Sequence, residues 1–353
     1  MRLRFLPMLL ATVLMTAGED PFEAPVELKD FAQKHTSIQH GTSGKVGALI
    51  TAFFATPEDG GLGITYDNTY TRTPKEVWRD RKANCLGLTA LYVAACKAIG
   101  LDARYGESLR VSRWRRVGQT IRYERHLVAV VPNGNIGQEI VADFLPEFHR
   151  GTLLIATLEP ARVQALFHSN RAVELLEEGS TQEALRQAQQ SIEVDPGLAV
   201  GWNILGVVQK AQGMVSVAES SFRKAIAADP ADGAPCGNLE NLLRAQGRES
   251  EATDLRERSM KIRLRDPYFN AFLAEESLGE GQLEESDRRI RQAIRLLPRE
   301  PDFYVIQARV SLALGQKRDA IKALEKARKW SLPEMQAHYD SKLALLKGET
   351  PTP

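Results

Sequence analysis

Glycine recurs with a fixed period of 34 residues through the second half of the chain. The period runs unbroken through Gly179, Gly213, Gly247, Gly281 and Gly315. A small residue, alanine or serine, follows each glycine five residues later and again twelve residues later. Small side chains at fixed offsets allow helices to pack closely, and glycine readily ends a helix. The pattern therefore predicts a stack of helix pairs, one pair per period.

The period resembles that of the tetratricopeptide repeat. The second repeat carries the most motif positions, namely Trp202, Leu205, Gly206, Ala218, Phe222 and Pro230. Gln209 departs from the usual tyrosine, and the third repeat lacks its closing proline, with Pro267 falling just after. The resemblance implies five repeats over residues 165–334, ten helices in one continuous stack, and a capping helix and tail over residues 335–353. Its concave surface would bind a protein or peptide partner.

The first half contains a second strong pattern, a helix that begins at a cysteine. Leu88, Leu91, Ala95 and Ile99 recur at helical spacing, and Cys85 lies in the first turn. Unpaired N–H groups and a partial positive charge at a helix N-terminus favour a thiolate, so a nucleophile is one interpretation. The other is a small apolar residue that fills core space. The helix alone leaves both open.

Two short strands with a turn between them follow this helix. Ile121 to Val131 alternates with the period of a strand and includes His126, and Gln138 to Leu145 includes Asp143. A turn centred on Gly134 and Asn135 would place His126 directly opposite Asp143. A turn centred one residue earlier would pair His126 with Val141 and leave Asp143 on the diagonal. Either register brings imidazole and carboxylate together on one face.

A cysteine hydrolase needs a thiolate, an imidazole that moves a proton, and a group that orients the imidazole. The order and spacing of Cys85, His126 and Asp143 resemble the transglutaminase-like superfamily, relatives of papain-type cysteine proteases. The segments that carry the likeness are 81–85, 98–104, 125–128 and 142–144. Ala83 stands where many members have glycine. The resemblance implies an α+β catalytic domain over residues 19–160, followed by the all-α solenoid.

In that family Cys85 would be the nucleophile, His126 the base and acid, and Asp143 the residue that orients the imidazole. The Trp78 side chain is a candidate oxyanion donor, although packing is its ordinary role. The leading hypothesis is a hydrolase, an amidase or peptidase, with the repeats recruiting partner or substrate. Transglutaminase-type acyl transfer to an amine by the same triad is an alternative. Another is a non-catalytic assembly factor in which this domain is only a fold.

The N-terminus and the composition bear on location and partners. Arg2 and Arg4 precede an apolar run from Phe5 to Met15, so residues 1–18 are typical of a secretory signal too short to span a bilayer. We therefore expect an exported protein, periplasmic or extracellular, without stable membrane insertion after cleavage. The three cysteines have no metal-ligand spacing, and the net charge of +1 gives no general attraction to nucleic acid. No metal or cofactor is expected.

Overall fold

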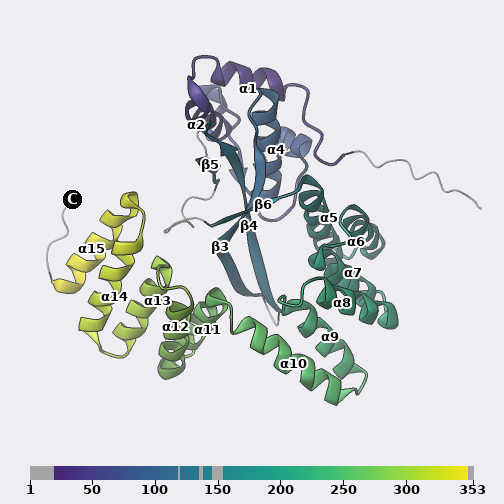
Figure 1. Cartoon of the computed structure of the whole chain (residues 1–353), viewed down its shortest axis with the longest axis vertical. Helices are drawn as coiled ribbons and strands as arrows, with labels where there is room; N and C mark the ends of the chain where they lie inside the picture. Colours follow the sequence, from purple (N-terminus) through teal and green to yellow (C-terminus); the bar gives the residue numbers. More distant parts are fainter. Residues whose placement is uncertain (1–19, 118–119, 135–137, 145–153, 349–353) are drawn as a thin grey trace, which may run out of the picture.

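The computed structural model describes residues 20–117, 120–134, 138–144 and 154–348. Figure 1 shows two kinds of architecture in them: a sheet with helices packed against it, and a long series of paired helices. The predicted signal segment, residues 1–18, lies outside the described residues, as does the end of the tail. Within the described ranges, no helix is both long and apolar enough to cross a membrane.

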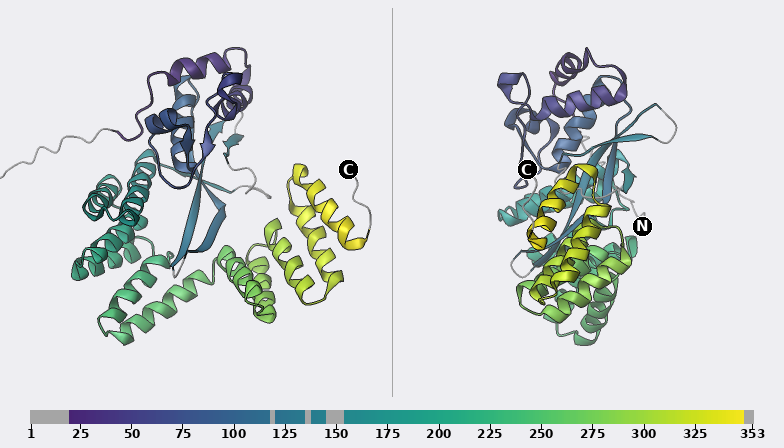
Figure 2. Two further views of the ribbon diagram at one scale, coloured as in Figure 1. Left: turned by 180° about the vertical axis from the view of Figure 1, so that it is seen from behind. Right: turned by 90° about the vertical axis from the view of Figure 1, so that its left-hand side faces the viewer.

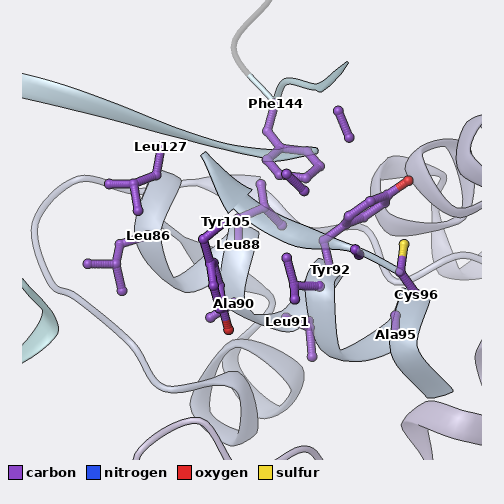
Figure 3. Packing of buried hydrophobic residues seen from close by; sticks show 14 of the residues in the cluster. Leu86, Leu88, Ala90, Leu91, Tyr92, Ala95, Cys96, Tyr105, Leu127 and Phe144 are labelled. Atoms are coloured by element: carbon purple, nitrogen blue, oxygen red, sulfur yellow. The ribbon is translucent and has the colours of Figure 1, made fainter. Parts of the chain in front are cut away.

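Helix α4, Cys85–Ala98, lies at the centre of the first part. Every residue from Leu86 to Val93 is buried, which is typical of a helix inside a core rather than a surface helix with one apolar face. Figure 3 shows α4 side chains packed beside Leu127 and Phe144. Three helices pack around it, namely α1 (Leu28–Thr36), α2 (Gly41–Phe54) and α3 (Pro74–Asp80). A short 3₁₀ turn, Pro57–Asp59, follows α2.

The main sheet is antiparallel and has the strand order β5-β4-β3-β6. Its strands are β3 (Arg104–Val117), β4 (Thr120–Pro132), β5 (Glu139–Ala142) and β6 (Ile155–Leu158), and a separate parallel pair joins β1 (Thr65–Tyr66) to β2 (Lys82–Ala83). Strands β3 and β4 form a long hairpin that reaches toward the paired helices (Figures 1 and 2). Strand β3 packs there against α11, Pro267–Gly279.

The register between β4 and β5 differs from both predicted registers. Ala129 pairs with Ala142 and Pro132 with Glu139, so Asp143 lies opposite Val128 rather than opposite His126. The reason is a longer loop, closed by a hydrogen bond from the Asn133 N–H to the Gln138 carbonyl oxygen. The shift is an even number of residues. Because side chains alternate with period two, Asp143 and His126 still share one face as diagonal neighbours.

The C-terminal part confirms the predicted helical repeats of the tetratricopeptide type. Within the described residues, ten helices form five pairs: α5 (Pro160–Glu177) with α6 (Thr181–Val194), α7 (Ala199–Ala211) with α8 (Val215–Ala228), α9 (Ala234–Ala245) with α10 (Glu249–Arg263), α11 with α12 (Leu283–Leu296), and α13 (Pro301–Ala313) with α14 (Lys317–Trp330). A 3₁₀ turn, Pro333–Met335, leads to α15, Gln336–Lys347. Tyr339 and Leu343 of α15 cover the last pair.

The periodic glycines occupy the turn inside each helix pair. Their φ angles are 82°, 76°, 75°, 75° and 74° from Gly179 to Gly315, the left-handed conformation that L side chains rarely adopt. The small residues at the two fixed offsets are all buried at helix contacts. Where serine replaces alanine, its hydroxyl donates to a carbonyl in the neighbouring helix or directly before it, as Ser286 does to Ala274 at 2.7 Å. The period therefore sets both the turns and the packing.

The repeats do not form one continuous stack. Successive helices pack from α5 to α10 and again from α11 to α15, whereas contacts between α10 and α11 are sparse. Pro196, Pro230 and Pro298 follow the second helix of their repeats and force the preceding residue into an extended conformation. Leu264 stands at the corresponding place in the third repeat and stays helical, with φ −68° and ψ −11°. The prediction of a single stack is thus wrong at this junction.

The close packing of α7 against α8 in the second repeat can be tested by adding one methyl group at Gly206. A Cβ added at Gly206 would lie 2.6 Å from the ring of the buried Phe222, so we expect Gly206→Ala to lower the free energy of unfolding by about 1–3 kcal/mol. Gly279, in α11, has no atom within 4 Å of such a Cβ. Gly279→Ala should therefore be neutral or stabilise by roughly 0.5–1 kcal/mol. Urea denaturation of both variants checks this, and equal effects would contradict it.

Candidate active site

Cys85 is the first residue of α4 because Asn84 caps the helix. The Asn84 backbone is extended, and its side-chain oxygen accepts a hydrogen bond from the Gly87 N–H at 3.0 Å. Asparagine is among the preferred N-cap residues, since it satisfies one of the unpaired N–H groups of the first turn. Cys85 is half-buried, unlike Cys96 and Cys236, which are buried. Burial raises the pKa of the Cys96 thiol to about 12. Cys96 is therefore a packing residue of the core.

Gly87 allows α3 to lie close against the first turn of α4. A Cβ at this position would lie 2.6 Å from the backbone oxygen of Arg72 and 3.2 Å from the Val77 side chain. A capping box in which Thr73 and Glu76 satisfy each other's backbone N–H groups fixes the start of α3. Cys85 therefore lies at the N-terminal end of α4, and the close approach of the Arg72 backbone to Gly87 holds this end on one side.

The structure brings the imidazole of His126 onto the carboxylate of Asp143. His126 Nε2 lies 2.8 Å from Asp143 Oδ1, and the two side chains are only 6% and 9% exposed. Cys85 lies near enough to the imidazole to raise its pKa together with Asp143. Because Nε2 is directed at the carboxylate, Nδ1 is the ring nitrogen left to face other partners. The structure thus brings Cys85, His126 and Asp143 together, although they come from a helix, a strand and the end of the next strand.

The surroundings of His126 decide its protonation state. Burial on its own lowers the pKa of this imidazole, but hydrogen bonds and charges from Asp143 and Cys85 outweigh it and raise the pKa to about 9. The ring is therefore an imidazolium at neutral pH. With an imidazolium nearby, the Cys85 sulfur can attack a carbonyl carbon while His126 delivers a proton to the departing group.

The Trp78 side chain makes packing contacts with Phe31, Arg81 and the core. Its ring meets that of Phe31 edge-on at 5.5 Å, and the guanidinium of Arg81 lies 4.7 Å from its centre. Trp78 contacts the core that includes α4 and is only partly buried. No interaction between Trp78 and the three site residues is found among the described residues. Its role as an oxyanion donor stays a prediction.

A set of residues that the sequence analysis did not select supports the cap of α4. The Asn84 side chain donates to the hydroxyl of Thr71 at 2.7 Å, and the Thr71 N–H donates to the carboxylate of Glu174 at 2.8 Å. Glu174 lies on α5, in the first repeat, 103 positions further along the chain. Asn84 could have been found from its place before an apolar helix. Nothing local in the sequence connects Thr71 with Glu174.

Within the described residues, no group of three or more histidine, cysteine, aspartate or glutamate side chains is placed to hold a metal ion. His126 and Asp143 contact each other, and Cys85 lies near enough to the imidazole to raise its pKa. The chemistry that these side chains can support on their own is nucleophilic attack and proton transfer.

No family model and no curated protein matches the chain. A solved structure of PilF from Pseudomonas aeruginosa is 17% identical, over 54% of this chain and 87% of that one, with a TM-score of 0.30. YrrB, described as a TPR protein with an unusual peptide-binding site, is 21% identical, over 51% and 92%, with a TM-score of 0.27. PilW, described as a type IV pilus biogenesis factor, is 18% identical, over 52% and 86%, at 0.28.

The helix pairs, their buried small residues and the five left-handed glycines define repeats of the tetratricopeptide type. The chain is thus a helical-repeat protein whose N-terminal α/β part brings a cysteine, a histidine and an aspartate close together.

Proposed function

We propose that the protein is an exported cysteine hydrolase, an amidase or peptidase of the transglutaminase-like type, with the repeats binding a protein or peptide. Cys85 attacks the carbonyl carbon of the substrate and forms a thioester, while His126 gives its proton to the leaving amine. His126 then takes a proton from water, which attacks the thioester and frees the acid. Asp143 holds the imidazole in orientation throughout. The observation that carries the proposal is the 2.8 Å contact of His126 with Asp143, with Cys85 at a helix N-terminus near enough to raise the pKa of that imidazole.

Acyl transfer to an amine starts from the same thioester, so it remains an alternative for the second step. A further candidate is a non-catalytic assembly factor. What favours it is the share of the chain given to repeats, which run from Pro160 to Trp330 of 353 residues and need no reacting cysteine. In that case the histidine–aspartate contact would only stabilise the fold.

A thiol-reactive peptide probe separates the catalytic and non-catalytic candidates. We expect the native protein to be labelled at neutral pH on Cys85 alone, because Cys96 and Cys236 are buried. Cys85→Ser should abolish labelling while leaving the thermal unfolding temperature nearly unchanged. The adduct is mapped by mass spectrometry of peptides. Labelling no faster than that of the unfolded chain would favour the assembly factor. Offering the thioester an amine in place of water then distinguishes transfer from hydrolysis.

A further inference from the structure

The loop of residues 67–73 lies between the first repeat and the N-terminus of the cysteine helix. On one side, Arg171 of α5 lies over the ring of Tyr70 at 3.7 Å and pairs with Glu174 at 2.9 Å. Glu174 accepts the Thr71 N–H at 2.8 Å. On the other side, the Thr71 hydroxyl accepts a hydrogen bond from Asn84 at 2.7 Å. The first repeat therefore contacts the helix cap through one threonine.

Each member of this series is removed from water. Thr71 is 1% exposed, Asn84 is 5% exposed, and the Glu174 side chain is 18% exposed. A buried polar group that loses its partner is destabilising, so each hydrogen bond strongly favours one orientation of its neighbour. With its NH₂ group fixed on Thr71, the Asn84 side chain has its oxygen directed at the Gly87 N–H, which it caps at 3.0 Å.

The direction of the first turn matters for the cysteine. Cys85 directly follows Asn84, and the proposed mechanism needs its sulfur beside the His126 ring, which contacts Asp143 at 2.8 Å. If the cap were lost, the first turn of α4 would fray, and the sulfur would lose both the helix terminus and the imidazolium. A displacement of the order of 1 Å at a reacting group can cost ~10²-fold in rate.

We infer that Thr71 and Glu174 are positioning residues for the Cys85 nucleophile, so that the first repeat is a working part of the site and does more than recruit a partner. This inference rests on the proposed function. Glu174 and Thr71 act through Asn84 and touch no substrate.

The test measures alkylation of Cys85 by iodoacetamide between pH 5 and 9 in the full chain. Thr71→Val keeps the side-chain shape but removes the acceptor for Asn84, and we expect an approximately tenfold slower reaction at pH 7. The difference should shrink as the pH rises, because hydroxide ionises any accessible thiol. Thr71→Ser restores the hydroxyl and should return the rate to within twofold of wild type. Glu174→Ala should slow the reaction less than Thr71→Val.

Thr36→Val is the matched control. Thr36 is 5% exposed and its hydroxyl donates to Ala32 within α1, so the variant also removes one buried hydrogen bond. We expect a similar loss of stability and no change in the alkylation rate. A Thr71→Val protein that reacts like wild type at pH 7 would overturn the inference and leave the proposed function intact. Wild type that reacts no faster than His126→Ala would remove the proposed function and, with it, this inference.

Discussion

A chain that ends after Glu159 is expected to lose its folded structure instead of retaining a reactive cysteine. Val163, Leu166 and Phe167 of α5, with Leu198 beyond α6, belong to the same hydrophobic core as α4. Burying one such side chain is worth about 1.5–3 kcal/mol, so the four together contribute roughly 6–12 kcal/mol. That matches the whole stability of an ordinary domain, about 5–15 kcal/mol. The hydrogen bond from Thr71 to Glu174 would be lost as well.

A second truncation provides the control. A chain that ends after Arg265 keeps α5 to α10 and stops at the junction where helix contacts are sparse. We expect it to unfold cooperatively, with Cys85 alkylated at close to the full-length rate. Circular dichroism during heating and the alkylation rate at pH 7 measure both properties. A chain ending after Glu159 that unfolds cooperatively and reacts like the full chain would show that the α/β part folds independently, as the boundary at residues 160–165 implies.

Features with a local physical cause were predictable from the sequence. Gly179 and its four counterparts mark turns because few other residues accept a left-handed backbone, and this depends on nothing distant. The capping box of Thr73 and Glu76 is equally local, as is the start of a helix at Cys85. The break after the third repeat also had a local sign. Leu264 stands where a proline closes the first, second and fourth repeats, but its consequence for packing was not predicted.

Features that depend on distant parts of the chain were missed or only partly found. The contact of His126 with Asp143 was predicted from a register that proved wrong, because the loop after Asn133 is longer than a two-residue turn. The contact survived because an even shift keeps both side chains on one face. The hydrogen bond from Thr71 to Glu174 spans 103 positions and has no periodic or motif signal. Tertiary packing alone creates it.

The stability of the protein is expected to fall as the pH rises from about 6.5 to beyond 9, with His126 as the cause. In the folded chain, burial opposes the charged imidazole, but Asp143 and Cys85 raise its pKa from the ordinary 6.5 to about 9. A pKa that is higher in the folded state means that proton binding stabilises that state. The contribution is complete below about pH 6.5 and is lost as the pH passes through about 9. A shift of this size corresponds to about 3 kcal/mol.

His126→Gln isolates this contribution because glutamine does not titrate. Urea unfolding of both proteins at pH 6.0 and pH 9.5 should show wild type losing about 2–3 kcal/mol more than the variant. Asp143→Asn should remove more of the difference than Cys85→Ser, because the hydrogen bond to the carboxylate is the stronger of the two interactions that raise the pKa. The His126 side chain is only 6% exposed, so salt should screen the effect little. Equal pH dependence in wild type and His126→Gln would mean that the imidazolium does not form, and the acid step assigned to His126 would then have no proton to deliver.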